Sequence, residues 1–201
     1  MWEGYVNALT DFIAKHKLEK AEIVIDRFHV AKHYRTGFDK QRKRELKRLK
    51  EELPEEIFER DCQGALWLLR RNYDTLNEKQ RSQLQRLLAH SSKLHEAYTL
   101  RTELTTIFEM ALSREQGKTR LQKWIDKVER SKLTCFNKAI KTLNNHLDLI
   151  ANYFTHRANS GFVEGFNNKL KVVKRRCYGI KKVDSLFQRL WLDTTGYRRF
   201  A

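Results

Sequence analysis

The chain has 201 residues, of which 41 are Lys or Arg and 25 are Asp or Glu, so its formal net charge at pH 7 is +16. Forty per cent of the residues are hydrophobic, which is enough apolar surface for a core and excludes a wholly disordered chain. No apolar run approaches the roughly 18 residues of a membrane-spanning helix, so we expect no membrane partner. The excess of positive charge makes a polyanion, and nucleic acid first, the expected partner.

A single Pro and eight Gly leave few breaks for a many-stranded fold, so the composition predicts a predominantly α-helical chain. Cys62, Cys135 and Cys177 form no C-x-x-C pair, which argues against a disulfide framework or a zinc ribbon. The opening MWEGYVNALTDF lacks the basic stretch and apolar run of a secretory signal. We therefore expect the protein in the reducing cytoplasm.

The first predicted element is an amphipathic helix that ends near His16 and Lys17, because apolar residues recur at helical spacing between positions 2 and 13. The spacing of the apolar residues then changes. Ile23–Ile25 is a short β-branched run, which we interpret as a strand buried on both faces, with Asp26 at its carboxyl end.

Helical patterns fill the rest of the chain. From Phe28 to about Lys50 we expect one long basic helix, which Pro54 ends. Between positions 55 and 154 there is no strand signal, and Asn77 and a capping box at Ser113 mark helix starts.

Two further helices are expected near the carboxyl end. The first runs from about Phe162 to Tyr178, with Gly179 as its C-terminal cap. The second covers Ser185 to about Trp191.

The positive charge is concentrated in two segments. Lys32–Lys50 holds nine basic and two acidic residues, and Lys169–Lys182 holds seven basic residues and no acidic one, so each carries +7. Each segment follows a notable acid, Asp26 or Glu164. Cations that hold a phosphodiester strand beside metal-binding carboxylates are what a site acting on nucleic acid needs, although two solvated helix faces would give the same pattern.

Glu164, Asn168, Lys171 and Arg175 share one face of the predicted helix, because 100° per residue places them in a single narrow stripe. The stripe would hold a carboxylate, an amide and two cations toward a cleft. The simpler interpretation, an ordinary amphipathic surface helix, stays open. The apolar residues on the opposite side of this helix are Val163, Phe166, Leu170, Val173 and Cys177.

Asp26 also has two interpretations on spacing alone. Ligands gather at the carboxyl ends of strands in α/β folds, which favours a ligand-binding carboxylate. A helix N-cap for the segment that starts at Phe28 explains the same position equally well.

Two long segments resemble bacterial insertion-sequence transposases of the ISL-three type: VIDRFHVAKHYR around Asp26, and SGFVEGFNNKLKVVKRRCYGIKKVDSLFQRL around Glu164. The opening MWEGYVNAL is also similar, and the resemblance covers essentially all 201 residues. It implies a transposase with an acidic (DDE) triad. It also implies a partial RNase-H-like α/β core with one strand retained at 1–45, a large all-helical insertion at 46–155, and core helices at 156–201.

By this resemblance Asp26 is the second acid of the triad and Glu164 the third, and both are catalytic metal ligands. The complete enzyme would hold two Mg²⁺ ions that activate a water or a 3′-hydroxyl and stabilise the leaving oxygen. Lys171 matches a basic position that contacts DNA in related transposases. The DNA-binding residues that we predict are Asn168, Lys171, Lys174, Arg175 and Arg176.

In the family the first acid directly precedes the position of Met1, so we expect a carboxyl-terminal fragment that lacks this acid and the amino-terminal DNA-binding regions. We expect such a fragment not to cleave or join DNA by itself. The alternative is a non-catalytic protein. It would bind DNA nonspecifically, or pair with another copy of itself or with full-length transposase and block assembly.

Overall fold

The computed structural model describes residues 2–18, 21–158 and 161–196. These residues are predominantly α-helical, as the composition predicts, and no strand occurs among them. The chain groups into two compact units, Met1–Ala158 and Asn159–Ala201, which we call the first and second units. No helix of the described residues is both long and apolar enough to cross a lipid bilayer.

The first helix, α1 (Trp2–Lys15), ends where the sequence predicts. Its end is a Schellman motif in which Lys17 takes the left-handed conformation, with φ of 52°. The Lys17 N–H donates to Ala14 O at 3.2 Å, and the Leu18 N–H donates to Ile13 O at 3.1 Å. These two bonds satisfy carbonyl groups that the helix end would otherwise leave unpaired.

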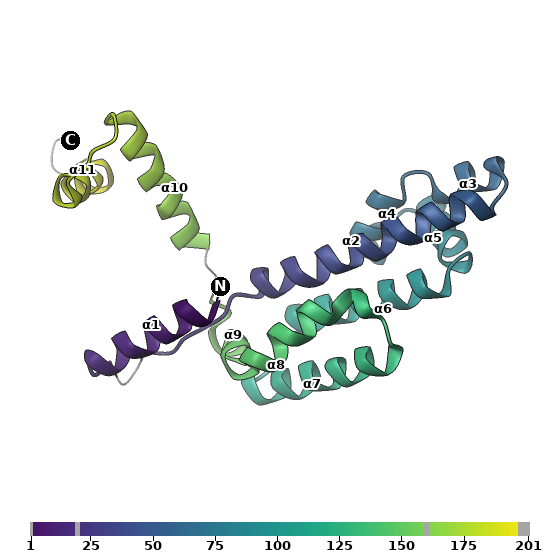
Figure 1. The fold of residues 1–201 in the computed structure, drawn as a ribbon, viewed down its shortest axis with the longest axis horizontal. Helices are drawn as coiled ribbons and strands as arrows, with labels where there is room; N and C mark the ends of the chain where they lie inside the picture. Colours follow the sequence, from purple (N-terminus) through teal and green to yellow (C-terminus); the bar gives the residue numbers. More distant parts are fainter. Residues whose placement is uncertain (1, 19–20, 159–160, 197–201) are drawn as a thin grey trace. The chain divides into compact units, whose positions relative to one another are not determined.

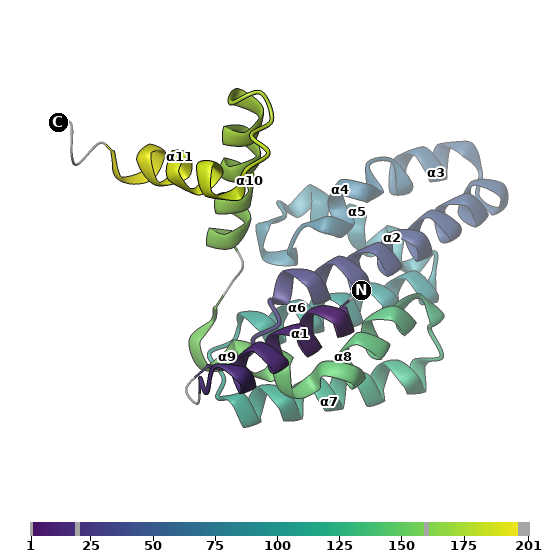
Figure 2. The same cartoon turned by 60° about the vertical axis from the view of Figure 1, so that its left-hand side comes forward.

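The long helix α2 (Arg27–Glu52) organises the first unit and confirms the predicted basic helix. It packs along α6 (Ser92–Glu109) and α8 (Asn137–Ala151), and α7 (Arg114–Ser131) packs against both of these (Figure 1). The smaller elements of this unit are α3 (Glu55–Cys62), α4 (Ala65–Arg70), η1 (Tyr73–Thr75), α5 (Glu78–Ala89), η2 (Thr134–Phe136) and α9 (Tyr153–His156). Of these, α3, α4 and α5 gather along the carboxyl-terminal half of α2 (Figure 2).

The two caps that the sequence marks in this unit are confirmed. Asn77 Oδ1 accepts from the Gln80 N–H at 2.9 Å, and Ser113 Oγ accepts from the Gln116 N–H at 3.2 Å. Each glutamine side chain accepts from the backbone of its cap residue in return, which completes a capping box. The starts of α5 and α7 are therefore fixed by local sequence.

The core of the first unit includes the contacts of α7 with α6 and η2 and the contact of α2 with η2. Trp124 is 1% exposed, its Nε1 donates to Leu100 O of α6 at 2.8 Å, and its ring packs edge-on against Phe136. Gly37 of α2 faces η2 so closely that an added methyl group would overlap the carbonyl oxygen of Cys135. A side chain at this position would force α2 away from η2.

A buried carboxylate ties α3 to α5. Asp61 has a side chain 1% exposed and accepts from Arg60 Nε at 2.9 Å and Arg86 Nε at 2.7 Å, with His90 Nε2 2.9 Å from its second oxygen. The hydrogen bonds from Arg60, His90 and Arg86 outweigh burial and hold the pKa of Asp61 well below its usual value. The carboxylate is thus ionised in the folded protein at neutral pH.

The predicted strand at Ile23–Ile25 is wrong. This segment is neither helix nor strand, and its polar groups bond to the end of α8: the Ile25 N–H donates to Leu149 O at 3.1 Å, and Asn152 Nδ2 donates to Ile23 O at 2.9 Å. Ile25 is buried, as a β-branched run predicts, but so short a run does not distinguish a strand from an extended segment packed on helices. The described residues contain no sheet, so no RNase-H-like core is present among them.

The second unit consists of α10 (Gly161–Arg176) and α11 (Val183–Thr195), which pack against each other. Both helices are predicted from the sequence, although α11 extends further at each end than its apolar pattern indicates. Val173 of α10 and Leu190 of α11 are each 4% exposed and form the buried part of this unit.

The end of α10 differs in detail from the predicted glycine cap. Tyr178, with φ of 51°, takes the first left-handed position, and Gly179 follows with φ of 76°. The Tyr178 N–H donates to Arg175 O at 3.2 Å and the Gly179 N–H donates to Lys174 O at 2.9 Å, which is a Schellman motif. Gly179 supplies the second hydrogen bond of this motif, and Tyr178 occupies the left-handed position that glycine usually takes.

The division of the chain at 158 and 159 falls close to the boundary that the family resemblance places between 155 and 156. The other boundary, between 45 and 46, lies inside α2, which is one helix from Arg27 to Glu52. The three-part domain organisation therefore stays a prediction.

Candidate functional site

The polar face of α10 is exposed along its whole length. Glu164, Asn168, Lys171 and Arg175 are all exposed, and at 100° per residue they fall within an arc of about 60°. Glu164 lies in the first turn of the helix, where the amino-terminal end of the helix dipole favours a carboxylate. One face of this helix therefore carries a carboxylate at its start and cations toward its end.

The opposite side of α10 packs toward α11, as its apolar stripe predicts. Val173 is buried, and Phe166, Leu170 and Cys177 are half-buried. The side chain of Val163, which the sequence places in the same stripe, lies outside the described residues. Packing of this stripe orients the polar face away from α11.

The cations of α10 differ in their partners. Lys169 is held within the unit, because its ammonium donates to Asp193 O at 3.1 Å and lies 3.4 Å from the Asp193 carboxylate. Lys171, Lys174, Arg175 and Arg176 are exposed, and none of them forms an ion pair with a described residue. Their charge is therefore available to an external anion.

A shallow hollow of about 670 Å³ marks the end of this face. It is lined by Lys171, Lys174, Arg175, Tyr178 and Gly179. The Tyr178 ring is fully exposed, and three cations surround the hollow that it lines. Cations that bind phosphates beside an exposed aromatic ring that stacks on bases are the combination found in single-strand nucleic-acid sites.

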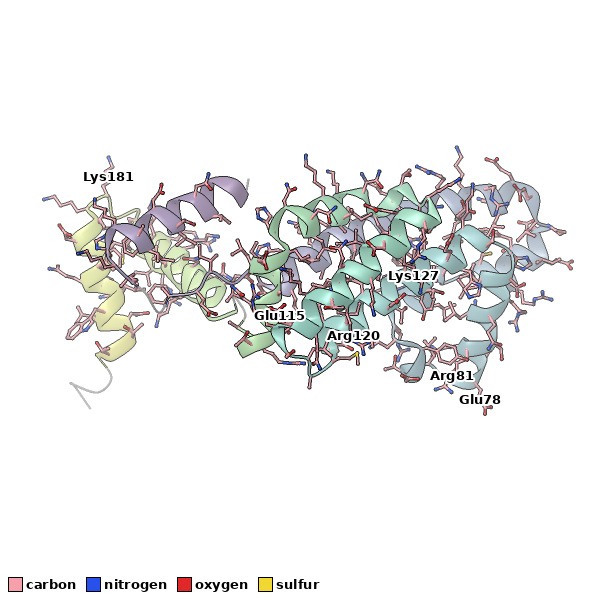
Figure 3. The ribbon with its side chains drawn as sticks, turned by 90° about the horizontal axis from the view of Figure 1, so that it is seen from below. Glu78, Arg81, Glu115, Arg120, Lys127 and Lys181 are labelled. Carbon is pink, nitrogen blue, oxygen red and sulfur yellow. The ribbon has the colours of Figure 1, made fainter. Side chains whose placement is uncertain are left out.

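The connection between α10 and α11 adds more positive charge. Lys181 projects outward from this connection (Figure 3), and Lys182, the next residue, is also exposed. Arg176 is exposed but does not line the hollow, because at 100° per residue it lies about 140° around the helix from Lys171 and about 160° from Lys174, which do.

Asp26 stands at the start of α2 and caps it. Its Oδ1 accepts from the Phe28 N–H at 2.9 Å, and its backbone is extended, with φ of −61° and ψ of 135°. The cap interpretation is therefore confirmed, while the ligand interpretation stays a prediction. A carboxylate has about four acceptor sites and a cap bond uses one, so the two roles are compatible.

Carboxylate oxygens are the ligands that Mg²⁺ prefers, so the residue types of Asp26 and Glu164 suit this ion. The described residues bring no three metal-ligating side chains together. Asp26 belongs to the first unit and Glu164 to the second, and their meeting around a metal stays a prediction.

The second predicted basic segment, within α2, is partly neutralised. Arg42 Nε lies 3.3 Å from Asp39, and Arg48 Nη2 lies 3.0 Å from Glu45. The remaining cations of the segment are exposed and form no ion pair with a described residue. These exposed residues are Lys32, Arg35, Lys40, Lys43, Arg44, Lys47 and Lys50.

Tyr178 and Arg101 are not among the functional residues that the sequence predicts. The signal for Tyr178 was an aromatic residue between two basic runs, directly before the glycine that ends a helix. Arg101 carries no local signal, because its neighbours Arg35 and Arg70 come from distant parts of the chain.

Comparison with known proteins identifies the family. A family model described as a transposase, of the DDE type and the ISL-three group, matches residues 1–190. The transposase for insertion sequence element IS1001 of Bordetella parapertussis is 33% identical over 175 residues, which are 85% of this chain and 41% of the relative. The transposase for element IS1557 of Mycobacterium tuberculosis is 26% identical over 139 residues, which are 69% of this chain and 31% of the relative. No solved structure matches the chain.

This chain therefore belongs to the ISL-three family of transposases, as its two long motifs indicate. It spans less than half the length of these two relatives.

Proposed function

We propose that this chain is part of the catalytic portion of a transposase that cleaves DNA and transfers the strand during insertion-sequence transposition. The observation that carries the proposal is the face of α10, where Glu164 begins a stripe that ends in an exposed tyrosine and in cations that pair with no acid of the described residues. A site of this kind suits a phosphodiester that must lie against cations near a carboxylate. Its substrate would be DNA, and a cytoplasmic location would suit this substrate.

Asp26 and Glu164 would hold two Mg²⁺ ions together with a third carboxylate, and these ions would supply the activation of a water or a 3′-hydroxyl. The chain's own part is to hold DNA. Lys171, Lys174 and Arg175 would contact phosphates, and Asn168 and Arg176 would contact the strand on either side of the hollow.

A chimera tests the catalytic proposal. This chain would replace the matched segment of the Bordetella parapertussis relative, and strand cleavage and transfer would be measured with Mg²⁺ or Mn²⁺. We expect activity that is abolished by Asp26→Asn or by Glu164→Gln. The control Glu129→Gln, at an exposed carboxylate of α7, should leave activity unchanged. Undiminished cleavage by the two acid variants would contradict the assignment.

We also propose that these 201 residues do not cleave DNA alone, because the family resemblance assigns only two of the three triad acids, Asp26 and Glu164, to them. The same assay on the isolated chain should show no nicking. Robust nicking that Glu164→Gln abolishes would refute this statement and would show that two acids suffice.

A second candidate function is a non-catalytic one, and the exposed cations of α10 favour it equally. The chain would then bind DNA nonspecifically, or join full-length transposase or another copy of itself and block assembly. Co-expression with an active relative distinguishes the two, because a blocking protein lowers transposition even when it carries Glu164→Gln. Unchanged transposition would exclude the blocking role.

A further inference from the structure

A small cavity in the first unit is rich in guanidinium groups. It has a volume of about 320 Å³ and lies where α2, α4 and α6 come together. Its lining is Arg35, Phe38, Asp39, Arg70 and Arg101. Three cations and one carboxylate therefore share a space of the size of a small ion with its hydration water.

Arg101 is a buried cation. The residue is 6% exposed, and its Nη2 donates to the backbone oxygen of Arg70 at 2.8 Å, but its Nη1 is buried with no hydrogen-bond partner. No carboxylate of the described residues lies within ion-pair distance of it. Burial lowers the pKa of Arg101 from its usual value, and the charge of Arg35 adds to this, whereas Tyr34, Tyr98 and the carboxylate of Glu109 act in the opposite direction. A buried, uncompensated cation is costly, so the fold must gain something from retaining it.

Asp39 does not supply the missing negative charge. Its carboxylate lies 2.7 Å from Arg70 Nη2 and 3.3 Å from Arg42 Nε. Burial alone would raise the pKa of Asp39, but the hydrogen bonds and charges of Arg70 and Arg42 outweigh burial and lower it. The carboxylate therefore stays ionised and holds Arg70 at the cavity wall, while Arg101 and Arg35 form no ion pair with a described residue.

We propose that this cavity binds a single phosphate group. Its oxygens would accept hydrogen bonds from the guanidinium groups of Arg35, Arg70 and Arg101, which suit the fork geometry of phosphate recognition. A water molecule would satisfy the hydrogen bond of Nη1 but not the charge, whereas an anion satisfies both. The site lies in the first unit and does not depend on the proposed DNA surface of α10.

Thermal unfolding of the full chain tests the site without DNA. The melting temperature would be measured in sodium phosphate and in sodium chloride of equal ionic strength. At a phosphate concentration ten times Kd, we expect a gain of about 3–6 °C over chloride. Arg101→Met should abolish the gain, and Arg35→Met, at an exposed residue that leaves the fold intact, should reduce it strongly. Arg130→Met, which removes one exposed charge from α7, should keep it.

Equal gains in the wild type, Arg35→Met and Arg101→Met would overturn the proposal, and so would a wild type that responds to chloride as it does to phosphate. If Arg101→Met does not fold, Arg35→Met decides the result.

Duplex DNA then identifies the source of the phosphate. If a backbone phosphodiester occupies the cavity, Arg35→Met weakens binding of a duplex oligonucleotide, and inorganic phosphate competes with that duplex. If free phosphate is the ligand, Arg35→Met loses the thermal gain while its affinity for DNA is unchanged. Either result leaves the α10 surface to be judged by its own variants, so failure of one proposal is distinguishable from failure of the other.

Discussion

Neutralising the cations around the α10 hollow should change how DNA binding responds to salt. The variant replaces Lys171, Lys174 and Arg175 with Gln, because these three line the hollow and form no ion pair with a described residue. Each phosphate contact to duplex DNA adds about −0.9 to the slope of log K against log salt concentration, so losing three should reduce the slope by about 2.7. Between 50 and 200 mM salt, the wild type should therefore lose about 40-fold more affinity than the variant.

The assay is fluorescence anisotropy of a labelled duplex at four or more salt concentrations. A matched control replaces Lys123, Arg130 and Lys141, three exposed cations of α7 and α8, with Gln. This control changes the net charge by the same amount, so it reports on general electrostatic attraction. We expect its slope to remain within about 1 of the wild-type slope.

Equal slopes for the α10 variant and the wild type would refute the assignment of DNA contacts to this face. Equal reductions in the α10 variant and in the control would show that net charge, and not a defined surface, governs binding.

Other substitutions test the exposed ring of Tyr178, the buried carboxylate of Asp61 and the close approach of α2 to η2 at Gly37. Tyr178→Ala should weaken binding of single-stranded DNA by about 1–3 kcal/mol with an unchanged salt slope, in the same anisotropy assay. Asp61→Asn should lower the free energy of unfolding in urea by about 2–3 kcal/mol at pH 7, a moderated loss because its arginine partners are half exposed. This difference should shrink as the pH falls below about 4. A carboxylate with a lowered folded-state pKa stabilises the fold fully only above its unfolded-state pKa, which for Asp is about 4. Gly37→Ala should cost about 2–4 kcal/mol through overlap with Cys135, whereas Gly165→Ala, which meets nothing within 4 Å, should gain about 0.5–1 kcal/mol of helix propensity.

The helices and their caps could be predicted because they depend on neighbours in the sequence. The capping boxes at Asn77 and Ser113 and the end of α2 before Pro54 all follow from side chains within four residues of the feature. The polar face of α10 was predictable for the same reason, because a regular helix fixes which residues share a side.

Features that depend on distant residues could not be predicted. Ile23–Ile25 has the composition of a strand, but strand formation also needs a partner, and its backbone bonds to α8 instead. The cavity around Arg101 joins side chains of three helices, and nothing near any of the three arginines in the sequence points to the others. Contacts between residues far apart in the sequence, and not local propensity, determine the conformation of Ile23–Ile25 and the lining of this cavity.

Asp26 shows why a structural explanation of a residue does not exclude a chemical one. Asn and Asp cap helices about equally well, so Asp26→Asn should leave the stability of α2 nearly unchanged, whereas Asp26→Ala should cost about 1 kcal/mol. If Asp26 also binds metal, both variants should lose strand transfer in the chimera, because neither Asn nor Ala supplies the negative charge that Mg²⁺ requires. Full activity of Asp26→Asn alongside reduced stability of Asp26→Ala would show that Asp26 serves only as a cap. Loss of activity in Asp26→Asn with unchanged stability would instead show that the carboxylate acts in the chemistry.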